Sequence, residues 1–72
     1  MGTKYDWSNV PKDINWIATD SDGMKCHYKN EPKQCLRSWH FDDEEDLGDC
    51  FFDSTYANDW KNSLEKRPVE KN

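Results

Sequence analysis

Long apolar runs, glycine-rich loops and a positive net charge are all missing from this sequence. No stretch approaches the roughly 20 apolar residues that a membrane-spanning helix needs, so none is expected. The net charge is −5, with 10 Lys and Arg against 15 Asp and Glu. Because affinity for phosphates depends on Lys and Arg, this balance argues against direct binding to nucleic acid or to anionic membranes. The first residues contain no apolar signal core, so we also expect no secretion signal.

The chain has 72 residues, enough for one small domain. A domain of this size buries only roughly 60% of the surface that its unfolded chain exposes. The sequence holds four Trp, three Tyr and three Phe, and each aromatic side chain can bury about 150–250 Å². We therefore predict a folded chain, despite 35% charged residues. The prediction is a single domain over residues 1–72, ordered from about 6 to 68, with a loose tail at 69–72.

The cysteine count is odd, since Cys26, Cys35 and Cys50 are the three cysteines. A secreted scaffold held by disulfides would normally have an even number. Together with the absence of a signal core, this favours three reduced thiols in a cytoplasm.

Several segments have the composition of β-strands. Residues 15–19 are rich in aromatic and β-branched side chains. Residues 24–29 alternate, which places Met24, Cys26 and Tyr28 on one face and the intervening Lys25, His27 and Lys29 on a solvated face. An Asp-Gly step at 22–23 joins the two segments and predicts a hairpin. A third strand is expected over 36–41, and 50–52 could form a fourth.

The last ordered element is predicted to be a helix. Tyr56, Trp60 and Leu64 recur every four residues and would form one apolar stripe. Asp53 or Ser54 could cap its start, and Pro68 would end it. The predicted fold class is therefore α+β, a small three- to four-stranded antiparallel meander packed against one C-terminal helix.

Metal binding and catalysis are not favoured. Cys26, His27, Cys35, His40 and Cys50 are suitable zinc ligands by type, but their spacing matches no zinc module. The 20–23 segment resembles part of a calcium loop, yet Ala18 and Lys29 would fall at two ligand positions. No nucleophile motif is recognisable. We expect no cofactor, no metal and no enzyme activity.

An acidic segment with apolar neighbours is the candidate partner-binding surface. Its acidic members would imitate nucleic-acid phosphates or meet an Arg-rich patch, and its apolar members would act as anchors. The alternative is a solvated loop that keeps the protein soluble. The candidate residues are Asp42, Asp43, Glu44, Glu45, Asp46, Leu47, Asp49, Phe51 and Phe52, with Asp53 at the end of the segment.

Three motifs give the chain a resemblance to small uncharacterised proteins of tailed bacteriophages. They are Trp-x₃-Pro at 7–11, Trp-x-Ala-x-Asp-x-Asp-Gly at 16–23, and Trp-x₂-Ser-Leu-x₂-Arg-Pro at 60–68. The resemblance spans residues 6–68, but the acidic insert at 42–49 is not part of the shared pattern. Small phage proteins of this kind are commonly accessory factors that bind a bacterial protein inside the infected cell.

The resemblance therefore implies a phage accessory protein in the host bacterial cytoplasm. It would inhibit or modulate a host protein, as in host takeover or anti-defence. One alternative is a small-molecule binder that sequesters a nucleotide signal, with stacking aromatics and a cation such as Arg37 or Arg67. Another is a minor virion component.

Overall fold

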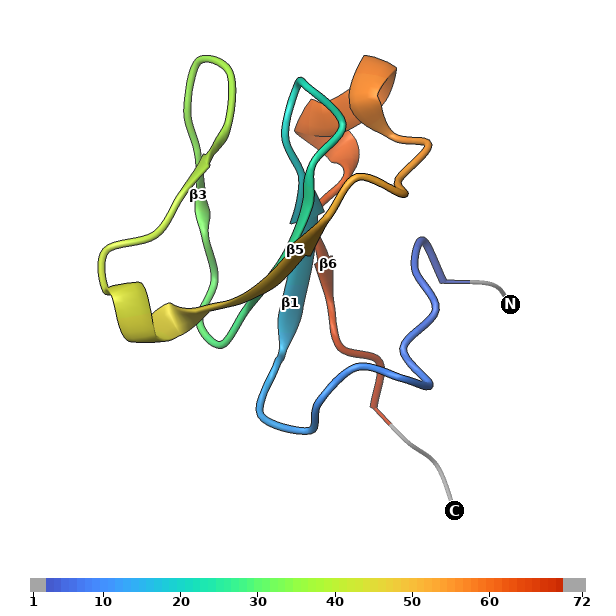
Figure 1. Ribbon diagram of the computed structural model, residues 1–72, viewed down its shortest axis with the longest axis vertical. Coiled ribbons are helices and arrows are strands. Elements are labelled where there is room, and N and C mark those ends of the chain that lie inside the picture. Colours follow the sequence, from blue (N-terminus) through green and yellow to red (C-terminus); the bar gives the residue numbers. More distant parts are fainter. Residues whose placement is uncertain (1–2, 70–72) are drawn as a thin grey trace.

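The computed structural model describes residues 3–69. Short strands and two 3-10 turns follow one another along the chain (Figure 1). In chain order the elements are β1 (Trp16–Thr19), β2 (Lys25–Tyr28), β3 (Lys33–Gln34), β4 (Trp39–His40), η1 (Glu44–Asp46), β5 (Leu47–Phe51), η2 (Ala57–Asn62) and β6 (Glu65–Lys66).

The main sheet is antiparallel, with strand order β5-β2-β1-β6. The predicted hairpin between its two central strands is confirmed, with Ile17 opposite His27. Gly23 has a φ of 93°, a value that suits glycine because it has no Cβ to clash. The local signals for strands and turn in this region were therefore sufficient to place β1 and β2.

The predicted strand at 36–41 is wrong over most of its length. Only Trp39 and His40 are in a strand, which pairs with β3 in a separate ribbon. This ribbon stands away from the main sheet in Figure 1. Leu36 is 93% exposed at the end of the ribbon. Trp39 anchors the ribbon in the core: its ring Nε1 donates to the Thr19 carbonyl at 3.0 Å, and its backbone N–H donates to Asp20.

The predicted C-terminal helix does not form, and the α+β fold class is wrong. Within residues 3–69 there are 3-10 turns but no α-helix. The segment expected to be helical forms η2, which is kinked at Asp59 with φ of −127° and ψ of 37°. It then continues into β6, which pairs with β1. The protein is therefore built from antiparallel strands and irregular segments.

Tyr56 and Trp60 pack on opposite faces of the main sheet, which explains why their spacing does not give a helix. The ring centres of Tyr56 and Tyr5 are 5.5 Å apart, and those of Trp60 and Trp39 are 6.2 Å apart. A helix would have placed residues four apart on one face. Buried Ser63 fixes the turn instead, because its Oγ accepts from the Thr19 N–H at 2.8 Å.

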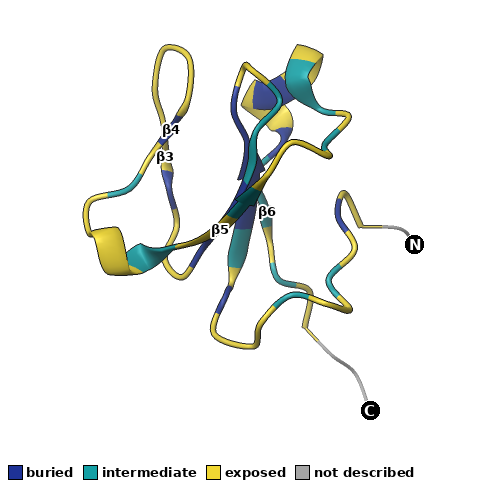
Figure 2. Cartoon of the chain, in the orientation of Figure 1, coloured by how far each residue is buried: buried dark blue, intermediate teal, exposed yellow. Residues whose placement is uncertain are grey.

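Each face of the main sheet has its own hydrophobic cluster. One contains Ala18, Cys26, Tyr28, Trp39 and Trp60. The other contains Tyr5, Ile14 and Ile17 and is covered by the N-terminal segment 3–15. Figure 2 shows the buried residues gathered along the central strands, while the ribbon and η1 are mostly exposed.

The N-terminal segment also covers part of β2, so the predicted solvated face of this strand is partly wrong. Only 6% of the His27 surface is exposed, because residues of this segment and β5 lie beside it. Trp7 attaches the segment to β6, because its Nε1 donates to Glu65 at 2.8 Å. Strand alternation placed His27 on the correct face, but that face is covered at His27 and remains exposed only towards Lys29.

Cys26 and Cys50 form a disulfide, so the prediction of three reduced thiols is wrong. The two residues are cross-strand partners in β2 and β5, with their Cα atoms 4.1 Å apart. Cys35 is exposed and unpaired in the described part of the chain. An odd count is therefore compatible with one disulfide and one free thiol.

At the C-terminus, Val69 is 85% exposed; the rest of the predicted tail, residues 70–72, lies outside the described residues. A helix long and apolar enough to cross a membrane does not occur within residues 3–69.

Candidate binding site at the end of β5

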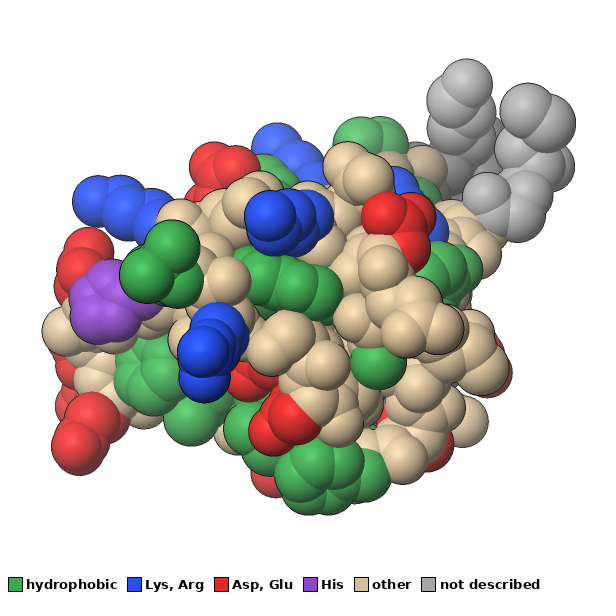
Figure 3. Space-filling model, turned by 90° about the horizontal axis from the view of Figure 1, so that it is seen from above, with side chains coloured by type: hydrophobic (Ala, Val, Ile, Leu, Met, Phe, Trp, Pro, Cys, Tyr) green, Lys and Arg blue, Asp and Glu red, His purple; other side chains and the backbone are tan. Residues whose placement is uncertain are grey.

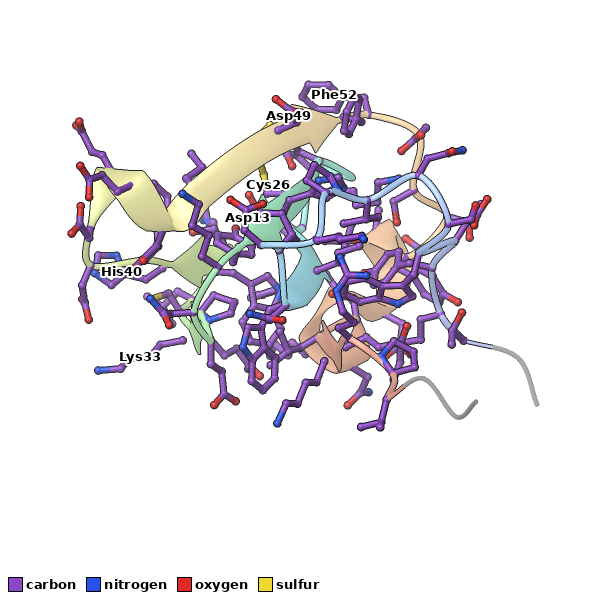
Figure 4. All side chains as sticks on the ribbon, turned by 90° about the horizontal axis from the view of Figure 1, so that it is seen from below. Asp13, Cys26, Lys33, His40, Asp49 and Phe52 are labelled. Atoms are coloured by element: carbon purple, nitrogen blue, oxygen red, sulfur yellow. A yellow bond between two sulfur atoms is a disulfide. The ribbon has the colours of Figure 1, made fainter. Side chains whose placement is uncertain are left out.

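The structure divides the acidic segment into two groups at opposite ends of β5. Residues 42–46 lie before and within η1, and residues 49–53 lie at the end of the strand. Five residues of β-strand advance the chain by roughly 13–17 Å. In Figure 4, Asp49 and Phe52 lie together at the end of β5, whereas His40 lies beside η1. The ten candidate residues therefore do not form one continuous patch.

The group at η1 is largely engaged in local hydrogen bonds. Asp43 caps η1 by accepting from the Glu45 N–H at 3.0 Å. Asp46 accepts from the Asn30 side chain at 2.7 Å, and Asp42 lies 3.1 Å from His40. Glu44 and Glu45 are exposed. These hydrogen bonds stabilise η1, which forms the end of the connection between β4 and β5.

The group at the end of β5 combines carboxylates with exposed aromatic rings. Phe51 is 43% exposed and Phe52 is 74% exposed, next to the exposed Asp49 and Asp53. Leu47, the third predicted anchor, packs instead against the hydrophobic core. Figure 3, which shows one face of the molecule, illustrates how hydrophobic side chains reach the surface between charged ones. Two of the three predicted apolar anchors are therefore available for contact.

A pocket of about 260 Å³ opens beside Phe51. Its walls come from three separate parts of the chain: the N-terminal segment, strand β2 and the end of β5. The lining residues are Asp6, Asn9, Val10, Lys25, His27, Phe51 and Asp53.

Lys25 connects the carboxylate and the aromatic ring of this pocket. Its Nζ lies 2.9 Å from an Asp53 oxygen and 5.4 Å from the centre of the Phe51 ring. The hydrogen bond from Lys25 lowers the pKa of Asp53. Hydrogen bonds from the Ser8 side chain and backbone likewise lower the pKa of Asp6. Both carboxylates are therefore ionised at neutral pH.

His27 is the unusual member of the pocket. Its Nδ1 is buried and has no hydrogen-bond partner among residues 3–69, although its ring lies 5.5 Å from the Phe51 ring. Burial lowers the pKa of His27, and the nearby Lys25 ammonium adds to this effect. The ring is therefore neutral at pH 7. A buried nitrogen without a partner costs stability unless something else satisfies it.

Asp6, Asn9, Lys25 and His27 line the pocket but carry no motif in the sequence that marks them as a site. The alternation of 24–29 does place Lys25 and His27 on one face. Nothing local indicates that Asp6 and Asn9 lie against that face, since this contact depends on how the N-terminal segment folds back over the sheet.

The residues of the metal and nucleotide alternatives have the following surroundings in the structure. Within the described residues, no three side chains of His, Cys, Asp or Glu gather as a potential metal site. Of the two cations considered for nucleotide binding, Arg67 donates to the carbonyls of Ile14 and Pro11. Arg37 lies in an exposed turn of the β3–β4 ribbon.

Comparisons with protein-family models, with curated proteins and with solved structures found no match to this chain.

Proposed function

We propose that this protein is a phage accessory protein that binds a positively charged surface of a host bacterial protein and thereby inhibits or modulates it. The observation that carries the binding role is the pair of exposed rings, Phe51 and Phe52, between the carboxylates Asp49 and Asp53. Aromatic residues are enriched at interfaces, and complementary charge provides orientation and a fast encounter. The phage and host assignments rest on the sequence resemblance.

The location that goes with this proposal is the host cytoplasm. The Cys26–Cys50 disulfide is the observation that stands against it, because disulfides are rare in reducing compartments. Thiol trapping in infected or expressing cells tests the location. A disulfide that is intact in the cell would move the proposed site of action to an oxidising compartment.

A pull-down from bacterial lysate with two matched double variants tests the binding role. Asp49→Lys with Phe52→Ser changes one exposed acid and one exposed ring at the end of β5. Glu44→Lys with Leu36→Ser makes similar changes on η1 and the ribbon, and Leu36 is 93% exposed. We expect one stoichiometric protein with a basic surface to be retained by the control variant and lost by the first. Equal retention by both variants, or loss by both, would contradict this surface.

A further inference from the structure

We propose that the pocket beside Phe51 receives an arginine side chain of the partner. This inference rests on the proposed function only for the source of the arginine. The pocket, the charges and the unpaired histidine nitrogen are properties of this chain alone.

The charge of the pocket favours a cation. Asp6 and Asp53 supply two carboxylates against the single ammonium of Lys25. Asp53 is already paired with Lys25, but Asp6 forms no ion pair within residues 3–69. An incoming cation would therefore find one unpaired carboxylate on the wall formed by the N-terminal segment.

The shapes of the groups favour a guanidinium over an ammonium. A guanidinium is flat, stacks on aromatic rings and carries five N–H donors in a fixed fork. Phe51 offers the ring, and Lys25 at 5.4 Å from its centre already uses that ring as a cation-binding surface. His27 contributes a wall of the pocket, and its buried Nδ1 lacks a partner among the described residues. An ammonium could pair with Asp6 but could not stack on Phe51 as a flat group.

The size and surroundings of the pocket favour a side chain over a free small molecule. Its volume of about 260 Å³ lies below the 300–1,000 Å³ usual for sites that enclose drug-sized ligands. Phe52 continues the apolar surface outside the pocket and is 74% exposed. A partner protein would cover Phe52 while one of its arginines enters the pocket, and arginine is enriched among the residues that dominate binding energy.

The test is an NMR titration of the intact, disulfide-bonded protein with Nα-acetyl-arginine amide at constant chloride. Nα-acetyl-citrulline amide, which has a similar shape and no charge, and Nα-acetyl-lysine amide are the comparison probes. Concentrations on the order of 100 mM would saturate a site with a Kd of about 10 mM. We expect saturable shifts at Asn9, Phe51 and the His27 ring with arginine, several-fold weaker binding of lysine, and no saturation with citrulline.

Two charge-matched variants make the result specific. Asp6→Asn should weaken arginine binding about tenfold, the loss expected for a charge-assisted hydrogen bond. Glu44→Gln removes the same charge at η1 and should leave the affinity unchanged. Absence of binding to the native protein, equal binding of citrulline, or equal losses in the two variants would overturn the inference.

The outcomes also separate this inference from the proposed function. If the probe does not bind but a basic partner is lost on Asp49→Lys with Phe52→Ser, the arginine pocket is wrong and the binding role stands. If the probe binds with the expected variant pattern but no partner depends on the β5 surface, the pocket stands and the binding role is wrong.

Discussion

The guanidinium carbon of Arg67 lies 4.9 Å from the centre of the Trp7 ring. This contact joins the first and last segments of the described chain. Arg67 also donates from Nε to the Ile14 carbonyl at 2.7 Å and from Nη2 to the Pro11 carbonyl at 2.6 Å. One side chain thus holds the N-terminal segment against the edge of the main sheet, and that segment forms a wall of the pocket.

Replacing Arg67 by Ala should destabilise the protein by about 2 kcal/mol, because hydrogen bonds from a charged group and a cation–π contact are lost together. For a domain of this size, the melting temperature should fall by roughly 10 °C. Thermal unfolding followed by Trp fluorescence measures the change. Lys12→Ala removes the same charge from an exposed position and should stay within about 0.5 kcal/mol of the native protein. Equal effects of the two variants would show that charge, not the Trp7 contact, is responsible.

Reduction of the Cys26–Cys50 disulfide should lower the free energy of unfolding by about 3 kcal/mol. The bond closes a loop with a sequence separation of 24. A cross-link over a loop of this length lowers the conformational entropy of the unfolded chain, which stabilises the folded state by about 3 kcal/mol. Urea unfolding with and without a reductant measures the loss. A variant with both cysteines replaced by Ala should be insensitive to the reductant. Thiol titration of the unfolded, unreduced protein should give one reactive group, Cys35; three would mean that the bond is not formed.

Gly48→Ala should destabilise the protein by about 1–2 kcal/mol, because the new methyl group would lie 2.9 Å from Ile14 Cδ1 and 3.2 Å from His27 Cβ. Ile14→Val removes the nearer atom and alone should cost about 0.5–1.5 kcal/mol. The double variant should therefore lose less stability than the sum of the two single losses. Chemical denaturation of all four proteins completes the cycle. Simple additivity would rule out the contact between these two positions.

His27 should make the protein less stable as the pH falls below about 6.5, the usual pKa of an unfolded histidine. Because burial lowers the pKa of His27 in the folded state, the unfolded chain takes up a proton first, and the free energy of unfolding decreases towards pH 5. Lys25 and Arg67 also lower this pKa, while Asp49 and Asp53 oppose them. The loss should level off below the folded-state pKa.

Urea unfolding at pH 7.5, 6.5, 5.5 and 5.0 measures this dependence, and His27→Gln is the control. Glutamine does not titrate in this range, so the variant should lose less stability between pH 7.5 and 5.0 than the native protein does. If the two proteins follow parallel curves, another group controls the acid sensitivity.

The residues of the three phage-like motifs occupy structural positions. Ala18 is fully buried, Gly23 adopts the positive φ of its turn, and Ser63 fixes the turn before β6. Trp60 lies in the core and Arg67 holds the N-terminal segment. The pattern therefore describes how this chain folds. The exposed group at the end of β5, which carries the proposed function, falls outside the motifs.

The β1–β2 hairpin could be predicted from local sequence, because alternation and the Asp-Gly step act over neighbouring residues. Leu47, Phe51 and Phe52 were all predicted as apolar anchors for a partner. The two Phe rings are exposed, whereas Leu47 packs against the core. The regular spacing of Tyr56, Trp60 and Leu64 was a misleading local signal. A helix would have satisfied it, but burying Tyr56 and Trp60 on opposite faces of one sheet covers both hydrophobic clusters.

The disulfide, the buried state of His27 and the pocket beside Phe51 all arise from tertiary contacts. Each depends on residues that are distant in sequence: Cys26 meets Cys50, and the segment around Asp6 meets β2. Local patterns carry no information on which segment covers a given face. That choice follows from the free energy gained when a chain this small buries large aromatic side chains on both faces of its sheet.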